Sequence, residues 1–246
     1  MAFNDHFSGH ASAYARYRPE YPPELFEYLA TLTPRREVAL DCATGSGQAA
    51  IGLARHFERV VATDGSVAQL KNAQAHPHVV YIGNLAEQPA LGNGVVDLAV
   101  AAQAAHWFDH SRFHDGIRRV LRPDGALALW TYALAFVTPQ IDAVVRYFYE
   151  DVVGPYWPAE RRYVMNEYRD LPFPWREVAA PKFQLRLEWT LEDFIGYIGT
   201  WSSTQRYTKV SGVDPLPALH AEMAPLWNSG ARPVVWPLHM RVGRPQ

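Results

Sequence analysis

Short apolar runs alternate with amphipathic stretches along the first half of the chain. Runs of strand length lie at 38–42, 59–64, 78–82, 95–101 and 125–132, and helical patterns or capping residues lie at 24–33, 47–56, 66–75 and 111–121. Repeated alternation of strands and helices predicts an α/β fold, in which a parallel sheet has helices on both faces. The nearly continuous apolar run at 95–102 is typical of a strand that is buried on both sides.

The pattern changes after residue 132. Residues 139–153 have apolar side chains at helical spacing, whereas 154–181 is rich in proline and aromatic residues, which predicts irregular structure. The remaining expected elements are a half-exposed strand at 183–189, helices at 191–201 and 215–226, and a closing strand at 234–242. Pro237 in the closing strand predicts a bulge or an unpaired edge there.

A glycine turn joins the first strand to the helix that follows it. Gly45 and Gly47 let the backbone turn sharply and approach a ligand, and the unpaired amides of the helix start stabilise anionic groups. Ligands of open parallel sheets bind beyond the carboxyl ends of the strands. Polar residues follow four of these ends: Asp41, Asp64, Asn84 and Gln103. The pattern indicates a nucleotide-like cofactor.

Two cofactors fit this turn. Gly45-x-Gly47-x-x-Ala50 matches the dinucleotide pattern, with Asp64 as the acid that binds the ribose, and this would indicate an NAD-dependent oxidoreductase. Asp41 favours the second cofactor, because an acid gains nothing beside a pyrophosphate but attracts the ammonium and sulfonium groups of S-adenosylmethionine. We therefore prefer S-adenosylmethionine and keep NAD as the alternative.

The chain resembles the class I S-adenosylmethionine-dependent methyltransferases over about residues 10–132. The matching segments, in family order and spacing, are 38–48, 60–66, 83–87, 95–100 and 119–125. The segment Gln103-Ala-Ala-His-Trp-Phe-Asp109 is similar to the branch that contains trans-aconitate methyltransferase and related small-molecule carboxyl methyltransferases. The resemblance implies a Rossmann-like fold with a seven-stranded, mostly parallel sheet in the order 3-2-1-4-5-7-6, an antiparallel strand 7, helices on both faces and a helical cap insertion.

The resemblance also implies one methyltransferase domain across 1–246. Its expected parts are an N-terminal gating segment and helix at 1–37, a cofactor-binding core at 38–132, and a cap insertion with the closing strands at 133–246. The residues expected at the cofactor are Tyr14, Arg18, Asp41, Ala43, Gly45, Gly47, Asp64, Gly65, Asn84, Leu85 and Gln103. In this family the leading segment often closes over the cofactor, which suggests Tyr14 and Arg18, although its aromatic residues could equally just pack on the sheet.

Two residues depart from the family pattern, which usually has glycine at Ala43 and aspartate at Asn84. Ala43 adds a methyl group and is expected to need an ordinary backbone conformation, which would weaken cofactor binding. Asn84 keeps an acceptor for the adenine amino group and adds a donor.

His106 follows the fourth strand and is expected beside the methyl group that is transferred. With a reference pKa of about 6.5, it could act as a general base toward a hydroxyl or an amine. A carboxylate acceptor needs no base, in which case His106 orients substrate or cofactor, and a purely structural histidine is equally compatible with the pattern. The residues expected at the substrate are Trp107, Tyr156, Trp201, Arg206 and Tyr207, where an arginine could hold a carboxylate.

Composition narrows the partners. A formal charge of −2 over 246 residues gives no global attraction to nucleic acid or to an anionic membrane. We expect a small-molecule substrate and a monomer or weak homodimer. The absence of an apolar run of bilayer length, of a signal-like N-terminus and of a second cysteine beside Cys42 leads us to expect a cytoplasmic protein. The histidine pairs 76/78 and 110/114 lack the further ligands that a metal needs.

The sequence thus predicts methyl transfer from S-adenosylmethionine, leaving S-adenosylhomocysteine, to a small molecule. A carboxylate oxygen is the favoured acceptor, with in-line displacement driven by positioning and desolvation. The alternatives are an NAD-dependent oxidoreductase and a non-catalytic cofactor-binding protein on a methyltransferase fold, the latter suggested by Ala43.

Overall fold

The computed structural model describes residues 19–245, so Tyr14 and Arg18 lie outside the described residues. The helices are α2 (Pro23–Thr31), α3 (Gln48–Leu53), α4 (Val67–Lys71), α5 (His110–Val120), α6 (Pro139–Tyr147), α7 (Arg161–Met165), α8 (Leu191–Gly199), α9 (Ser202–Ser211) and α10 (Leu216–Trp227). The short 3-10 helices η2 (Ala105–Trp107) and η4 (Gly154–Tyr156) and the π-helix η3 (Phe148–Val152) join them. The strands are β1 (Val38–Cys42), β2 (Arg59–Asp64), β3 (Val79–Gly83), β4 (Val96–Ala102), β5 (Leu121–Thr131), β6 (Arg176–Val178), β7 (Phe183–Trp189) and β8 (Arg232–Arg244).

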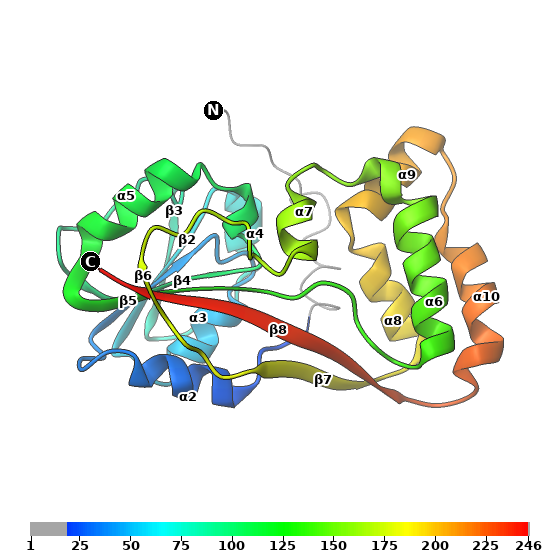
Figure 1. Cartoon of the computed structure of the whole chain (residues 1–246), viewed down its shortest axis with the longest axis horizontal. Helices are drawn as coiled ribbons and strands as arrows, with labels where there is room; N and C mark the ends of the chain where they lie inside the picture. Colours follow the sequence, from blue (N-terminus) through cyan, green and yellow to red (C-terminus); the bar gives the residue numbers. More distant parts are fainter. Residues whose placement is uncertain (1–18, 246) are drawn as a thin grey trace.

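The strands of residues 19–245 form one sheet in the order β3-β2-β1-β4-β5-β8-β6, with β7 also paired to β8 (Figure 1). Strands β1 to β5 pair in parallel, and β8 lies antiparallel to β5. The expected α/β class and strand order are therefore confirmed. The sheet differs from the expected seven strands because the position next to β8 is shared by β6 and β7, which pair with opposite ends of it.

Apolar side chains pack on both faces of the sheet. On one face α2 and α3 cover it, with Leu25 and Leu53 in a cluster that also contains Val100 from β4. On the other face α5 contributes Phe113 and Ile117. Figure 1 shows these helices on opposite sides of the strands. The periodicity of the first half of the chain therefore predicts the layers correctly.

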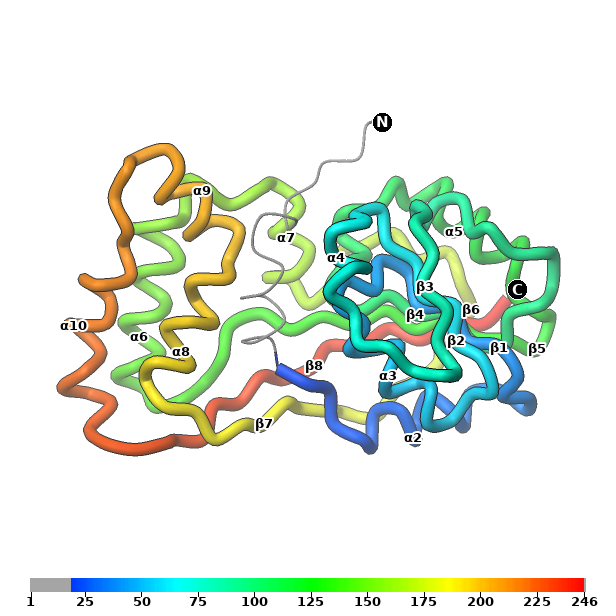
Figure 2. Tube along the Cα trace, turned by 180° about the vertical axis from the view of Figure 1, so that it is seen from behind, coloured from blue at the N-terminus to red at the C-terminus, as the bar shows by residue number. Residues whose placement is uncertain are grey.

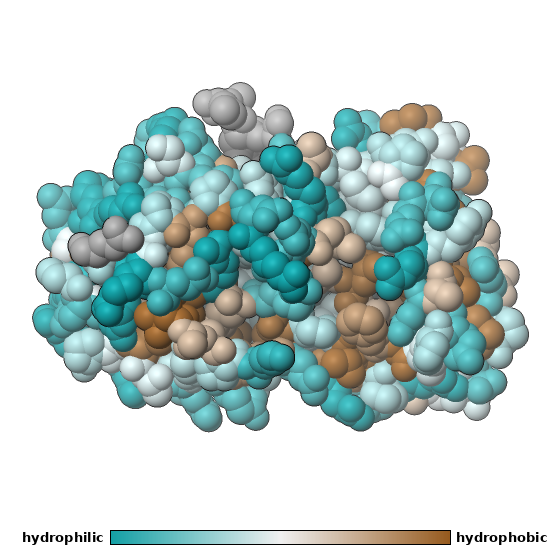
Figure 3. Space-filling view, in the orientation of Figure 1, coloured by the Kyte–Doolittle hydropathy of each residue, from teal (hydrophilic) through white to brown (hydrophobic). Residues whose placement is uncertain are grey.

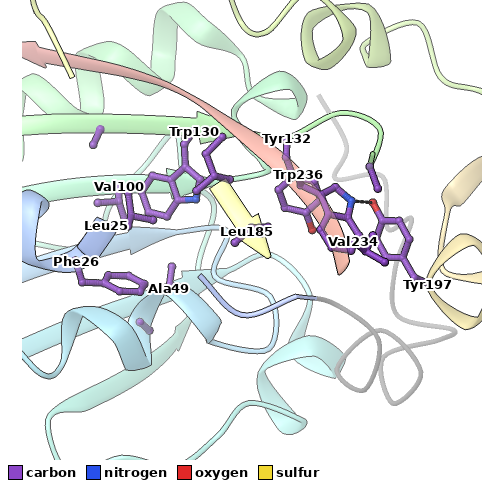
Figure 4. Packing of buried hydrophobic residues seen from close by; sticks show 14 of the residues in the cluster. Leu25, Phe26, Ala49, Val100, Trp130, Tyr132, Leu185, Tyr197, Val234 and Trp236 are labelled. Carbon is purple, nitrogen blue, oxygen red and sulfur yellow. Dashed lines mark hydrogen bonds between the residues drawn. The ribbon is translucent and has the colours of Figure 1, made fainter. Parts of the chain in front are cut away.

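A group of helices lies beside the sheet and forms the cap: α6, α8, α9 and α10 (Figure 2). Its core is continuous with that of the sheet, because Trp236 of β8 is fully buried and packs edge-on against Tyr197 of α8. The Trp236 indole also donates a hydrogen bond of 3.3 Å to the Tyr197 hydroxyl (Figure 4). The cap therefore shares its packing with the strand that closes the sheet.

Several elements of the second half differ from the expectation. Helix α9 was not predicted, since its sequence SSTQRYTKVS is largely polar, and α7 and β6 lie in the stretch that was expected to be irregular. At Pro237, by contrast, one of the two expected alternatives is found: Pro237 pairs with Gln184 in an unbroken register without a bulge, and because the pairing of β8 with β5 ends at His239, its other edge is unpaired there.

Most of the surface seen in Figure 3 is hydrophilic, and apolar residues form separate patches on it. Among residues 19–245, no helix combines the length and the apolar character needed to cross a bilayer.

A buried carboxylate ties the amino end of the sheet together. Asp97 of β4 accepts hydrogen bonds from the amides of Glu37 (2.9 Å) and Val38 (2.8 Å) and from the Arg122 guanidinium (2.6 Å). Arg122 also pairs with the half-exposed Glu37 carboxylate at 2.8 Å. One side chain thus joins β1, β4 and β5.

Replacing Asp97 by alanine is expected to lower the free energy of unfolding by about 3 kcal/mol, because two amides and a partly buried guanidinium lose their acceptor. Glu37→Ala is the matched control, since it removes the exposed partner of the same arginine and should cost less than about 1 kcal/mol. Urea unfolding of both variants checks this, and equal losses would contradict it.

Candidate active site

The turn between β1 and α3 has three residues with positive φ. Gly45 and Gly47 have φ of 58° and 90°, as their residue type allows, and Ala43 has φ of 54°. The expectation that Ala43 takes an ordinary backbone conformation is therefore wrong. The alanine adopts the conformation that the family's usual glycine would favour, so the turn keeps its shape at the expense of local strain.

Hydrogen bonds fix the turn against β2. The Thr44 amide donates to the Thr63 carbonyl at 2.8 Å, and the Gly45 amide donates to the Asp64 carboxylate at 2.8 Å. The other Asp64 oxygen accepts from the Ser66 amide at 2.7 Å, across the half-buried Gly65. Each carboxylate oxygen has a second lone pair, so Asp64 holds the turn and can still accept from ligand hydroxyls.

Asp41 is a fully buried carboxyl beneath this turn. Its Oδ2 accepts a hydrogen bond of 2.5 Å from the Thr44 hydroxyl, whereas Oδ1 has no hydrogen-bond partner among the described residues. Burial raises the pKa of Asp41 from 3.8 to about 7; the Thr44 hydrogen bond lowers it and the charge of Asp64 raises it further. Among residues 19–245, the carboxyl therefore has no positive partner that would favour its ionised form.

The other expected cofactor residues lie at the ends of neighbouring strands. After β3, the Asn84 side-chain nitrogen donates to the Gln88 carbonyl at 2.7 Å, and its oxygen accepts from the Leu85 amide at 2.9 Å. The Leu85 side chain is exposed. After β4, Gln103 has φ of 55°; its amide nitrogen donates to the Tyr132 carbonyl at 3.0 Å, and its oxygen accepts from Thr131 at 2.5 Å.

These residues fit S-adenosylmethionine. A Cβ at Gly45 would meet no atom of residues 19–245 within 4 Å, so these residues leave space beside the turn. Asp41 would supply an anionic partner for the ammonium group, Asp64 acceptors for the ribose hydroxyls, and Asn84 polar groups for the adenine edge. The observation that supports this fit is the buried Oδ1 of Asp41, which has no hydrogen-bond partner among the described residues.

A cavity lies beside the end of β4, between the sheet and the cap. It is lined by Gln103, His106, Trp107, Tyr132, Ala133, Trp157, Pro158, Arg161, Tyr197, Trp201 and Ser202. The lining is mainly aromatic. Arg161 is the charged residue among the described residues of the lining, with its guanidinium 4.6 Å from the centre of the Trp157 ring. The cavity therefore presents aromatic faces and one positive charge.

His106 is buried at the inner wall of this cavity. Its Nδ1 is hydrogen-bonded to the Tyr168 hydroxyl at 2.9 Å, and its ring lies 4.7 Å from that of Trp107. Burial, aided by the charge of Arg161, holds the pKa of His106 well below its usual value. The imidazole is therefore neutral near pH 7.

The structure brings together only part of the expected substrate site. Trp107 and Trp201 line the cavity with His106. Tyr156 and Tyr207 pack on each other, with ring centres 5.2 Å apart, and neither they nor the exposed Arg206 are among the lining residues.

Sequence reasoning missed Arg161 and Tyr168. Both lie in the segment 154–181, whose prolines and aromatic residues hide any periodic signal. The adjacent arginines 161 and 162 were the only hint of a cationic group there. Among residues 19–245 no group of three potential metal ligands is found.

The free energy of unfolding is expected to fall between about pH 4 and pH 7 because of Asp41. A carboxyl whose pKa is raised by folding binds more protons in the folded state, so stability is lost as the pH rises through this window. Asp41→Asn removes this dependence. As the pH rises from 4.5 to 8, the free energy of unfolding of the variant should increase by about 2–4 kcal/mol relative to that of the wild type. Chemical unfolding at both pH values checks it, and parallel pH profiles would contradict it.

Ala43→Gly is expected to stabilise the free protein by about 0.5–1 kcal/mol, because relief of left-handed strain exceeds the extra entropy of glycine in the unfolded chain. Gly45→Ala is the matched reverse change in the same turn, where the added Cβ meets no atom. It should destabilise by a similar amount. Thermal unfolding of both variants checks the pair, and two changes of the same sign would contradict the assignment.

Comparison with known proteins shows the family of the chain. Residues 40–129 match the family described as a methyltransferase domain. A provisionally named methyltransferase of Dictyostelium discoideum is 34% identical over 221 residues, which are 88% of this chain and 84% of that protein. The structure of a provisionally named type II methyltransferase from Anaeromyxobacter dehalogenans is 43% identical, with a TM-score of 0.86, and the match covers 94% of this chain and all of that one.

A methyltransferase structure from Anabaena variabilis shares the fold at 18% identity, with a TM-score of 0.52 over 90% of this chain and 98% of that one. A yeast relative, named as S-adenosylmethionine-dependent, is 26% identical over 63% of this chain and 58% of its own length. These matches decide between the two cofactors that the glycine turn admits. The chain belongs to the class I S-adenosylmethionine-dependent methyltransferases.

Proposed function

We propose that this methyltransferase modifies an oxygen of a carboxylate on a small molecule. The observation that carries the proposal is the charge of the cavity beside the cofactor turn. Among the described residues that line it, Arg161 is the charged one, and no aspartate or glutamate accompanies it. A cationic cavity of aromatic rings favours an anionic acceptor.

Arg161 is held in place by ring contacts. Its guanidinium lies over Trp157 at 4.6 Å and 5.7 Å from the ring of Tyr149, whose hydroxyl accepts a hydrogen bond of 3.2 Å from Nε. No carboxylate lies within ion-pair distance of it among residues 19–245. A guanidinium fixed in this way, with an unpaired charge, is suited to a bidentate hydrogen bond with a carboxylate.

The neutral state of His106 supports the same acceptor. A hydroxyl or amine nucleophile must lose a proton, and an imidazole with a strongly lowered pKa is a weak base for that purpose. A carboxylate is already ionised at neutral pH. The bound cofactor supplies an electrophilic methyl group, so that the new oxygen–carbon bond forms as the carbon–sulfur bond breaks, the electron pair stays on sulfur, and no proton moves.

The protein's own part is then to position and desolvate the acceptor. Trp107, Trp157 and Trp201 line the cavity, and their rings would displace water from a bound acceptor. Gln103 is fixed by two hydrogen bonds at the boundary between the cavity and the strand ends that face the cofactor. Holding the reacting atoms in line in this way can lower a barrier by roughly 7–11 kcal/mol.

The test is a transfer assay with methyl-labelled S-adenosylmethionine and a panel of aromatic and aliphatic carboxylic acids, each paired with its amide and its alcohol. Label should appear on the acids as methyl esters, which alkali releases as methanol. Transfer only to amides or alcohols would contradict the proposal, and cofactor binding without transfer to any acceptor would favour the non-catalytic alternative.

Arg161→Gln is expected to raise the KM for the best acid at least tenfold, a loss of about 1.4 kcal/mol, because the carboxylate loses its cationic partner. The Kd for S-adenosylmethionine should stay within about twofold. Arg206→Gln is the matched control, since it removes an exposed arginine that does not line the cavity. An unchanged KM in Arg161→Gln, or an equal rise in both variants, would contradict the role of Arg161.

A further inference from the structure

Tyr168 contacts His106 and is not among the described residues that line the cavity. It is fully buried, and its hydroxyl is hydrogen-bonded to His106 Nδ1 at 2.9 Å. A phenol has one proton to donate, and a buried hydroxyl proton without an acceptor is costly. Within residues 19–245, the His106 ring nitrogen lies at hydrogen-bond distance from this hydroxyl, and the Thr131 side chain also acts on it.

The neighbouring backbone indicates the direction of this hydrogen bond. The amides of His106 and Ala105 also act on the Tyr168 oxygen, where they oppose the rise in its pKa that burial causes. Amides only donate, so the phenol oxygen already has donors. Its own proton has two acceptors within reach: Nδ1, and the oxygen of Thr131, whose hydroxyl already donates to Gln103 at 2.5 Å. The 2.9 Å contact favours Nδ1, which leaves the proton of the neutral imidazole on Nε2.

The segment that carries Tyr168 is held under strain. Glu167 and Tyr168 have φ of 57° and 62°, which residues with side chains rarely adopt. Arg241 of β8 keeps the segment in place, since its Nη1 donates to the carbonyls of Tyr168 (3.2 Å) and Leu171 (2.7 Å). The Nε and Nη2 atoms of the same guanidinium donate to the two Glu177 carboxylate oxygens at 2.8 and 2.9 Å. Strain of this kind persists where surrounding contacts impose a geometry, and it often marks functional sites.

His106 has no partner on Nε2 among the described residues, and its ring lines the cavity. We propose that Tyr168 is a positioning residue that fixes the Nε2–H tautomer of His106, so that His106 presents a hydrogen-bond donor to the acceptor. The inference deepens the proposed function and rests on it only for the identity of the group that receives the bond. An Nε2 that already carries a proton cannot remove one from a substrate, so the site suits acceptors that arrive deprotonated.

The tautomer is measurable on the free protein, without an acceptor. The protein is labelled with nitrogen-15 histidine, and two-bond proton–nitrogen correlation spectra are recorded near pH 7.5. These spectra distinguish protonated from unprotonated ring nitrogens. The signals of His106 are assigned by their loss in the His106→Gln variant. His114 is an internal reference, because its Nδ1 accepts from the Trp175 indole at 2.8 Å and its Nε2 donates to the Pro172 carbonyl at 2.8 Å. His106 should show the same pattern as His114.

Tyr168→Phe keeps the ring and removes the hydroxyl. In this variant the His106 Nδ1 signal should move to the position of an imidazole nitrogen without a hydrogen bond, while the His114 signals stay in place. A proton on Nδ1 in wild type would overturn the proposal and would send the phenol proton toward Thr131 instead. Unchanged His106 signals in a folded Tyr168→Phe would overturn the role of Tyr168. If that variant does not fold, the wild-type spectrum alone still decides the tautomer.

These outcomes are independent of the acceptor. Failure of every carboxylic acid in the transfer assay would defeat the proposed function and leave the tautomer result standing. A wrong tautomer with successful transfer to acids would do the reverse.

Discussion

The antiparallel pairing of β8 is the interaction on which the site depends. One end of this strand pairs with β5, from Gly243 to His239, and the other pairs with β7 as far as Arg232. Trp236 extends from it into the core that the cap shares, and Arg241 reaches from it to the segment of Tyr168. Because one strand contacts the sheet, the cap and the segment of Tyr168, the cavity between them has a defined width.

The two halves of the site have opposite charge. Asp41 and Asp64 lie at the ends of β1 and β2, beneath the cofactor turn, while Arg161 lies in the cavity with no acid in its lining. Neutral Gln103 stands at the end of β4, next to β1. Under the proposed function, this separation of charge directs the cationic donor and the anionic acceptor to different parts of the site. Burial of Asp41 strengthens its attraction for a cation, because among the described residues its carboxyl accepts from the Thr44 hydroxyl but has no positive partner.

Local patterns predicted the strand ends and the turn at which the expected cofactor residues lie. The strand ends that bear Asp41, Asp64, Asn84 and Gln103 follow from apolar periodicity, and the glycine turn follows from residue type. Both signals lie within a few residues of the position that they predict. The conformation of Ala43 was not predictable in this way, since residue preference favours an ordinary φ and only the hydrogen bonds of the turn impose another.

The acceptor half depends on contacts between distant segments. Arg206 and Arg161 are both arginines near aromatic residues in the sequence, and only the packing of the cap determines which of them faces the cavity. The same holds for Tyr168, which meets a histidine 62 positions away. Helix α9 escaped prediction because its polar sequence lacks an apolar stripe, although Ser203 and Thr204 are buried by their neighbours. No local pattern encodes such placements.

The division of the outer strand into β6 and β7 affects how the molecule meets other copies of itself. An exposed, continuous edge strand offers unpaired backbone groups to any chain that approaches. Here the edge is interrupted at 179–182, where Pro181 cannot donate a backbone hydrogen bond and Lys182 adds a charge. On β7 the exposed positions are Gln184, Arg186 and Glu188, two of them charged. The long strand β8 is thus covered by two short ones, an edge poorly suited to sheet extension and aggregation.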